Sequence, residues 1–233
     1  MATSIAATAV LCSGGLDSVV LLAREARDGE VQPLYIRAGL AWEADERAAL
    51  WRVLDTPAFS GRVRPLVALD VTVRDVYPSS HWAIRGTPPA YDTPDEDVYL
   101  TGRNIVLLSK AGVFCATRGL HRIVIGPLAE NPFPDATPEF FRAMARALSL
   151  GLDHPIEIAA PFADMRKADV IRMGAELGVR MELSLSCMSP QAGRHCGLCS
   201  KCRERRDAFA EAGVTDQTVY AAPSPRPSTS SPA

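Results

Sequence analysis

Residues 13–18 are Ser13-Gly14-Gly15-Leu16-Asp17-Ser18, between the apolar run Thr8–Cys12 and a second apolar run that begins at Val19. A short apolar run that ends in glycines predicts a buried strand, and the residues after the turn predict a helix. The paired glycines allow the backbone to approach an anion closely, and the two serine hydroxyls join the unpaired N–H groups of the helix start. Most Gly-Gly turns only redirect the chain, but the serines and the acid favour a phosphate-binding turn.

These six residues resemble the SGGxDS signature of the PP-loop ATP pyrophosphatases. The resemblance implies that ATP adenylates a carbonyl oxygen and that pyrophosphate leaves. It also implies that Asp17 lies beside a catalytic Mg²⁺, although an aspartate at this point also suits a helix cap. The lysine of the Walker A motif is absent. The ATP-binding residues that the resemblance implies are Cys12, Ser13, Gly14, Gly15, Leu16, Asp17, Ser18 and Val19.

Length and composition are those of an ordinary globular chain. Its 233 residues suffice for one α/β domain with a small appendage, and its net charge of −2 argues against a broad nucleic-acid or membrane footprint. No apolar run approaches the ~18 residues of a membrane span, and residues 1–16 lack the basic start of a secretory signal. We therefore expect a cytoplasmic protein with no membrane partner.

Apolar runs alternate with amphipathic segments along most of the chain. Strands are expected at 8–12, 31–36, 63–69, 120–126 and 156–162, and helices at 19–25, 41–54, 105–114, 139–150 and 164–177. This alternation predicts an α/β fold, a parallel sheet with helices on both faces, and the PP-loop resemblance implies its Rossmann-like, adenine nucleotide alpha hydrolase-like (HUP) form. The expected divisions are a nucleotide-binding domain at 1–150, a small helical region at 151–213 and a disordered Pro/Ser-rich tail at 214–233.

Two segments near the expected ligand edge lack a regular pattern. Residues 73–97 contain four prolines, scattered aromatic residues and an acidic cluster, so we interpret them as a candidate lid, and a proline-rich loop follows at 127–138. Between these segments, Arg103 and Asn104 open a helix. They suit a phosphate or a planar ligand edge, and equally a surface salt bridge and a helix cap. Ligands bind at the carboxyl ends of parallel strands, which is where the Ser13 loop is expected.

Four of the six cysteines are clustered near the C-terminus, as Cys187-x8-Cys196-x2-Cys199-x2-Cys202. Closely spaced thiolates enclose a single metal ion, and in a chain without a secretory signal they indicate metal ligands rather than disulfides. Zinc is favoured, and an iron–sulfur cluster is the alternative. With four thiols present, His195 is not expected to be a ligand. Cys12 and Cys115 lie in apolar runs and are expected to be inert core residues.

Together the loop and the cysteines resemble the QueC/ExsB family of queuosine precursor biosynthesis, the 7-cyano-7-deazaguanine synthases, from about residue 8 to about residue 209. Residues 186–209 match the family pattern Ser-Cys…Cys-Gly-x-Cys-x-x-Cys-x-x-Arg-x-x-Ala-Phe. Residues 99–104 resemble its Tyr-x-Pro-x-Arg-Asn, and 133–140 resemble its Tyr-Pro-Asp-Cys-Arg-Pro-Glu-Phe. The resemblance therefore covers most of the chain.

The family implies a two-stage reaction of a small molecule, 7-carboxy-7-deazaguanine, with ammonia. One ATP adenylates the carboxylate, and ammonia displaces AMP to give the amide; a second ATP activates the amide, and loss of AMP gives the nitrile. The family also implies a structural Zn²⁺ at the four cysteines, and a homodimer is a further hypothesis. The catalytic residues implied are Asp17, Ser18, Arg103 and Lys167, and the substrate-binding residues are Arg103, Asn104, Phe133, Asp135 and Glu139.

The substrate-facing segments depart from the family pattern. Residues that differ are Thr101 for a proline, Phe133, Ala136 and Thr137 for Tyr, Cys and Arg, and Arg37–Trp42 for the Tyr-Gly-Gln-x-His segment. Because of these departures, the identity of the acceptor substrate is left open. A second hypothesis is therefore a divergent ligase that adenylates another carboxylate and passes it to ammonia, a protein amine or a nucleic acid.

A third hypothesis belongs to another class of protein. Arg203, Arg205 and Arg206 lie beside the cysteine cluster and suit a zinc-ribbon module that binds nucleic acid. The negative net charge weighs against nucleic acid as a partner. The preferred interpretation of these arginines is a solvated helix face.

Overall fold

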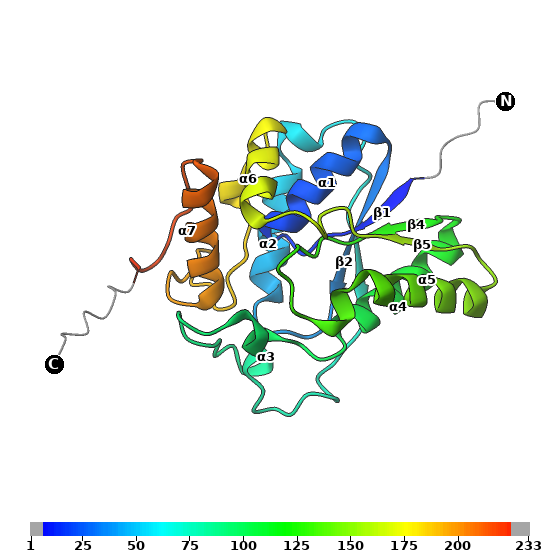
Figure 1. Ribbon diagram of the computed structural model, residues 1–233, viewed down its shortest axis with the longest axis horizontal. Helices are drawn as coiled ribbons and strands as arrows, with labels where there is room; N and C mark the ends of the chain where they lie inside the picture. Colours follow the sequence, from blue (N-terminus) through cyan, green and yellow to red (C-terminus); the bar gives the residue numbers. More distant parts are fainter. Residues whose placement is uncertain (1–6, 225–233) are drawn as a thin grey trace.

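A single parallel sheet lies at the centre of the computed structural model, which describes residues 7–224 (Figure 1). Its five strands lie in the order β3-β2-β1-β4-β5, and all neighbouring pairs are parallel. The strands are β1 (Thr8–Leu11), β2 (Val31–Arg37), β3 (Val67–Asp70), β4 (Arg122–Val124) and β5 (Glu157–Ala159). The predicted α/β class with a parallel sheet is confirmed.

Helices connect the strands and pack on both faces of the sheet. They are α1 (Leu16–Asp28), α2 (Glu43–Leu54), the single turn α3 (Trp82–Arg85), α4 (Arg103–Arg118), α5 (Pro138–Leu152), α6 (Lys167–Glu176) and α7 (Ser200–Ala212). The start of α5 illustrates how local sequence sets a boundary. Pro138 occupies the first turn, and Thr137 Oγ1 accepts a hydrogen bond from the Phe140 N–H at 3.1 Å.

Alternate residues of β1 enter two different hydrophobic cores. Val10 packs in a core that contains Val20 of α1 and Ile171 of α6. Ala9 and Leu11 pack in a second core, which contains residues of α4 and α5. Because successive strand residues point to opposite faces, the sheet has α1 and α6 on one side and α4 and α5 on the other. The prediction of helices on both faces is confirmed.

Three strands, β3, β4 and β5, are shorter than predicted by three or more residues. β3 begins at Val67 because Pro65 has no N–H to donate, and Val63 forms only an isolated bridge with Val31. β5 ends at Ala159, before Pro161. β4 keeps only the three residues Arg122–Val124 of the predicted 120–126. The existence of the strands was predictable from the apolar runs, whereas the strand ends are set by prolines and by the length of the neighbouring strand.

The irregular segment 73–97 is attached to other parts of the chain by hydrogen bonds. The Ala41 N–H donates to the Ala83 carbonyl at 2.9 Å, which attaches α3 to the chain after β2. Farther along, the Thr93 carbonyl accepts a hydrogen bond from Arg203 Nη2 of α7 at 3.3 Å. The segment therefore extends from the sheet edge to the cysteine-rich region, and its role as a lid stays a prediction.

The chain after α7 folds back onto the cysteine-rich region. The Ala221 N–H donates to the His195 carbonyl at 2.8 Å and the Ala222 N–H donates to the Cys196 carbonyl at 3.1 Å. The start of the predicted disordered tail at 214 is therefore wrong, because backbone hydrogen bonds hold this polar stretch in place; residues 225–233 lie outside the described part. The predicted boundary at 150 also falls inside the fold, since β5 pairs with β4.

None of the helices within residues 7–224 has the length and apolar composition needed to cross a membrane. This finding agrees with the absence of a long apolar run in the sequence.

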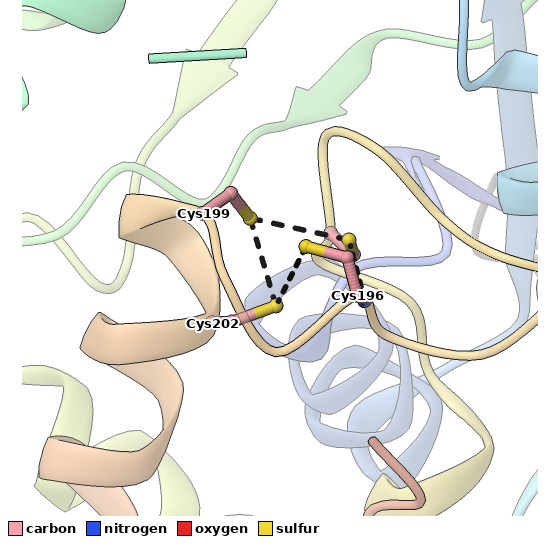
Figure 2. A group of neighbouring side chains, drawn as sticks. Cys196, Cys199 and Cys202 are labelled. Carbon is pink, nitrogen blue, oxygen red and sulfur yellow. Dashed lines mark hydrogen bonds between the residues drawn. The ribbon is translucent and has the colours of Figure 1, made fainter. Parts of the chain in front are cut away.

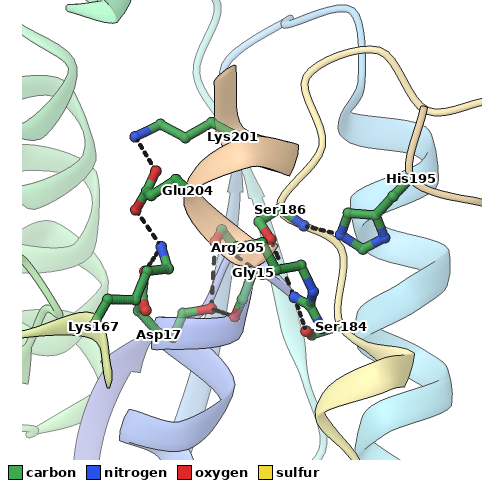
Figure 3. A network of polar contacts seen from close by, with 11 residues as sticks. Gly15, Asp17, Lys167, Ser184, Ser186, His195, Lys201, Glu204 and Arg205 are labelled. Atoms are coloured by element: carbon green, nitrogen blue, oxygen red, sulfur yellow. Dashed lines mark hydrogen bonds and ion pairs between the residues drawn. The ribbon is translucent and has the colours of Figure 1, made fainter. Parts of the chain in front are cut away.

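The interpretation of the three arginines as a solvated helix face is wrong for Arg205. Its side chain is fully buried, at 0% exposed. It donates hydrogen bonds to Ser184 Oγ (3.1 Å) and Ser186 Oγ (3.2 Å) (Figure 3). It also donates to Thr218 Oγ1 (2.8 Å) and the Met181 carbonyl (2.7 Å). Burial lowers the pKa of Arg205. A helical pattern does not reveal acceptors that come from loops on either side of α7.

Replacing Arg205 with methionine is expected to lower the free energy of unfolding by about 3 kcal/mol, because four buried acceptors lose a charged donor at once. Arg203→Met on the same helix is the matched control, and its partly exposed side chain should cost less than about 1 kcal/mol. Urea unfolding of both variants followed by circular dichroism measures the difference. Equal, small losses in the free energy of unfolding for the two variants would contradict a stabilising role of the Arg205 hydrogen bonds.

Candidate functional site

The loop between β1 and α1 has the backbone shape of an anion cradle. Gly14 has φ +83°, and a Cβ there would approach the Glu46 carbonyl oxygen of α2 to 2.7 Å, so only glycine fits. The Gly15 N–H donates to Ser13 Oγ, which also lies 3.3 Å from Ser18 Oγ, and Ser18 Oγ donates to the Gly15 carbonyl at 2.9 Å. Both serine hydroxyls therefore line the turn at the helix start, as predicted.

A cavity of about 540 Å³ opens at this loop, beside the point where the strand order reverses between β1 and β4. It brings together most of the residues that the sequence analysis singles out: Cys12, Ser13, Gly15, Leu16, Asp17, Ser18, Arg103, Asn104, Phe133, Asp135 and Lys167. Three expected site residues are not in its lining. Gly14 and Val19 are buried behind the loop, and Glu139 is exposed on the first turn of α5.

Asp17 and Lys167 are joined in a partly buried ionic chain with Glu204 of α7 (Figure 3). Lys167 Nζ lies 3.1 Å from Asp17 Oδ2 and 2.5 Å from Glu204 Oε1, and its side chain is only 12% exposed. Burial alone lowers the pKa of Lys167, but the two carboxylates outweigh it and raise that pKa. Asp17 Oδ1, the other oxygen, is buried with no partner in residues 7–224. The chain therefore presents one unpaired carboxylate oxygen at the loop.

Arg103, Asn104 and Asp135 lie together on the other side of the cavity. The Asn104 N–H donates to Asp135 Oδ2 at 2.9 Å, and Asn104 Nδ2 donates to the Asp135 carbonyl at 2.9 Å. Burial raises the pKa of Asp135. Arg103 Nε is buried and without a hydrogen-bond partner in the described chain. Asn104 and Asp135 thus hold each other, while Arg103 keeps a donor for a ligand.

Aromatic rings form the outer wall of the cavity. Trp42 and Trp82 stack with centroids 5.6 Å apart and an interplanar angle of 10°, and Tyr99 stacks on Phe133 at 5.0 Å. All four residues line the cavity. Flat apolar walls of this kind suit a planar heterocycle. Trp42 and Phe133 are among the residues that depart from the family pattern, so these departures bear directly on the ligand space.

Glu46 of α2 is a buried carboxylate in the same cavity. Its oxygens accept hydrogen bonds from Trp42 Nε1 at 3.1 Å and from the Tyr35 hydroxyl at 3.2 Å. Burial raises the pKa of Glu46 to about 7, against the opposing positive charge of Arg103. Cys12 lies nearby, and burial raises the pKa of its thiol to about 11, which fits the predicted inert cysteine.

The sulfur atoms of the four predicted metal ligands lie close together, and Figure 2 labels three of these residues, Cys196, Cys199 and Cys202. Their sulfur atoms all lie within 4.8 Å of one another, with Cys187–Cys199 at 3.9 Å, Cys196–Cys202 at 3.8 Å and Cys199–Cys202 at 3.5 Å. A tetrahedron with metal–sulfur bonds of about 2.3 Å has edges of about 3.8 Å. An iron–sulfur cluster distributes its cysteines over different irons and spaces them more widely. The cluster is therefore consistent with a zinc site.

Backbone hydrogen bonds connect this cluster to the loop and to the rest of the protein. The Leu185 N–H, two residues before Cys187, donates to the Gly14 carbonyl at 2.8 Å. The N–H groups of Cys196 and Gly197 donate to the cluster sulfurs of Cys187 and Cys202 at 3.2 Å and 3.4 Å. His195 is outside the group of four: its Nε2 accepts from the Ser186 N–H, and burial lowers its pKa to about 3.

Three residues of this site were not predicted: Glu46, Trp82 and Glu204. A signal existed for Glu46, because it shares a helical face with Ala49, Leu50 and Val53, all of which are buried. A glutamate on an apolar stripe indicates a buried charge. No comparable signal existed for Trp82, which lies in an irregular segment, or for Glu204, whose partner Lys167 is 37 residues away.

The family model and the sequence relatives agree on one family. The family model described as "Queuosine biosynthesis protein QueC" matches residues 7–213. A 7-cyano-7-deazaguanine synthase of Methanothrix thermoacetophila is 35% identical, with 90% of this chain and 96% of the relative aligned. One of Anaeromyxobacter dehalogenans is 36% identical, with 94% and 98% aligned. Among solved structures, the U34-tRNA thiolase NcsA from Methanococcus maripaludis with its [4Fe-4S] cluster gives a TM-score of 0.47 at 12% identity, covering 88% of this chain and 66% of that one.

Replacing Cys199 with serine is expected to abolish metal binding, because one of four thiolates is lost, and to lower the melting temperature as the surrounding loops lose their support. Cys115→Ala removes a buried thiol outside the cluster and serves as the matched control. Metal content by inductively coupled plasma mass spectrometry should fall from about one ion per chain to near zero only in the first variant. Retention of the ion by Cys199→Ser would contradict the four-thiolate site.

Glu46 should make stability fall as pH rises. Its pKa is about 7 in the folded protein against an ordinary value of 4.5, so between these values the folded state holds a proton that the unfolded state has lost. The free energy of unfolding should therefore decrease from about pH 4.5 to about pH 7, and Glu46→Gln should remove that part of the decrease. Unfolding titrations of both proteins across this range measure the difference. A Glu46→Gln variant with the parent's pH dependence would contradict the raised pKa.

Proposed function

The chain belongs to the queuosine biosynthesis protein QueC family, and from that premise we propose that its cavity is the active site of an ATP-dependent 7-cyano-7-deazaguanine synthase. The substrates of this reaction are 7-carboxy-7-deazaguanine, ammonia and ATP. The observation that carries the assignment to this cavity is the pair of unpartnered buried polar atoms, Asp17 Oδ1 and Arg103 Nε, which lie in one space with the glycine loop. Buried charged groups without partners are costly and indicate a missing ligand.

The loop suits the triphosphate of ATP. Serine hydroxyls and the N–H groups at the start of α1 point a positive field at an anion. Lys167 adds a full positive charge next to the loop. Cleavage between the α and β phosphates follows if the β and γ phosphates are held here while the α phosphate faces the rest of the cavity. The products are then AMP and pyrophosphate, never ADP.

The opposite wall suits the deazaguanine carboxylate. Its flat bicyclic ring suits a position against the aromatic side chains that line the cavity. Arg103, held at the start of α4 beside the Asn104–Asp135 pair, has the charge to bind the carboxylate. Phe133 lines this space, whereas Glu139 lies away from it and is no longer part of the proposal. This arrangement turns the carboxylate oxygen toward the nucleotide.

Two metals complete the proposal. Asp17 Oδ1 is an unpaired hard oxygen at the phosphate loop, so Asp17 would hold Mg²⁺, which supplies neutralisation of the pyrophosphate charge. The four cysteine sulfurs would hold Zn²⁺, whose ligand positions they fill, and that ion would be structural rather than catalytic. The expected homodimer and the expected cytoplasmic location remain predictions.

The alternatives differ in what supports them. Trp42 in the cavity wall, in place of the family's usual segment, is the one observation that favours a different acceptor, so other heterocyclic carboxylates belong in the assay. The nucleic-acid module loses its basis, because Arg205 is buried and Arg206 bonds to the Gly197 carbonyl at 2.8 Å and packs over the Tyr220 ring.

The proposal predicts the products of a direct assay. The purified protein with ATP, Mg²⁺, ammonia and 7-carboxy-7-deazaguanine should yield the nitrile and two AMP per nitrile, measured by mass spectrometry. Asp17→Asn should lower AMP release by at least about 100-fold, because the metal and phosphate oxygens lose a charged partner. Asp28→Asn, an exposed aspartate at the other end of α1, is the matched control and should be unchanged. ADP as the product, or an active Asp17→Asn variant, contradicts the assignment.

A further inference from the structure

Glu46 has no role in the steps above, yet it is a carboxylate buried inside the cavity. We propose that Glu46 is the general base that removes protons from nitrogen in both nitrogen steps of the reaction. This inference rests on the proposed function. It assigns a catalytic role to a residue that the PP-loop and cysteine motifs do not include.

Position favours this role over a purely structural one. The α2 backbone at Glu46 packs on the phosphate loop, since its carbonyl would lie 2.7 Å from a Cβ on Gly14. The side chain is close enough to Cys12, at the base of the loop, to raise the pKa of that thiol. It is also close enough to Arg103 to have its own pKa lowered by the guanidinium charge. Glu46 is therefore between the group proposed to hold phosphate and the group proposed to hold the substrate carboxylate.

The carboxylate is held rigidly by two neutral donors. Trp42 Nε1–H bonds to Oε1 and the Tyr35 hydroxyl bonds to Oε2, so each oxygen keeps a lone pair for a further partner. Neither donor is a cation, and no salt bridge to Glu46 is present in residues 7–224. A buried carboxylate without a cationic partner keeps its basicity, which a salt-bridged one loses.

The charged and titratable groups around it come from four elements. They are Tyr35 of β2, Glu43 of α2, Arg103 of α4 and Cys12 of the loop after β1. Burial and the negative charge of Glu43 raise the pKa of Glu46, and Arg103 and the hydrogen bonds from Tyr35 and Trp42 lower it. The balance, at about 7, matches the working range of a general base.

The chemistry needs such a base twice. When ammonia attacks the acyl adenylate, the C–N bond forms, an N–H proton passes to the carboxylate, and the C–O bond breaks with its electron pair leaving on AMP. In the second stage the amide oxygen takes the adenylyl group and the nitrogen loses one proton. The remaining N–H proton then passes to the base as the nitrogen lone pair forms the third C–N bond and AMP leaves. Adenylation of the carboxylate itself needs no base.

Because the nitrogen steps need a base and adenylation does not, Glu46→Gln, which keeps the size of the side chain, gives a direct test. Exchange of labelled pyrophosphate into ATP, dependent on 7-carboxy-7-deazaguanine, should stay within about twofold of the parent protein, whereas amide and nitrile formation should fall about 100-fold. Hydroxylamine is uncharged at neutral pH and gives a more acidic adduct, so hydroxamate formation by the variant should be nearly normal. Glu130→Gln, an exposed carboxylate at the cavity rim, is the matched control.

The pH profile supplies an independent readout. At constant free ammonia, the amide-forming rate of the parent protein should rise with pH up to about 7 and then level off, and Glu46→Gln should lack that rise. Tyr35→Phe removes a hydrogen bond that lowers the pKa of Glu46, so its rise should move to higher pH.

The outcomes separate the two proposals. Absence of exchange in the parent protein overturns the proposed function and, with it, the role of Glu46 that rests on it. Normal exchange in the parent but lost exchange in Glu46→Gln shows that Glu46 serves binding or folding, which overturns its role as base. Equal losses with ammonia and hydroxylamine overturn it as well.

Discussion

The ammonium group of Lys167, enclosed between the carboxylates of Asp17 and Glu204, is the interaction on which the site depends. It joins α1, α6 and α7, whose residues are 150 and 37 positions apart in the chain (Figure 3). Without the cation, two buried carboxylates would face each other and repel. Burial raises the pKa of Glu204, but the lysines outweigh it and lower that pKa to about 2, so the chain stays ionised. The same contact therefore connects α7, the helix that carries Cys202, to the aspartate of the glycine loop.

The cysteine-rich region needs this support because it has little regular structure of its own. Between α6 and α7 the chain contains only one 3-10 turn, at Met181–Leu183, and the described residues after α7 form no helix. Three kinds of contact order it: the four sulfurs, the buried Arg205, and the hydrogen bond from Leu185 to Gly14. Since that last bond ends on Gly14, the backbone connects the cysteine-rich region directly to the glycine loop.

The sequence predicted those features of the structure that depend on neighbouring residues in the chain. The glycine turn, the parallel strands and the spaced thiols follow from backbone sterics, alternation and ligand chemistry, and all are present in the structure. The failures are at contacts between distant segments. Arg205 has an ordinary helical sequence position, and its acceptors lie on loops up to 24 residues away. Strand ends were misplaced because Pro65 and Pro161 limit pairing from inside the predicted runs.

The stability of the fold does not explain why the cavity contains buried polar atoms without partners. A fold gains nothing by burying Asp17 Oδ1 and Arg103 Nε without partners, or Glu46 with only neutral donors. Each of these groups costs stability, and all three line the same space. Elsewhere the protein satisfies its buried charges: Glu25 is paired with Arg24 and Arg122, and Arg205 has four acceptors. The contrast within one chain indicates that the cavity's charges are kept for a ligand that completes them.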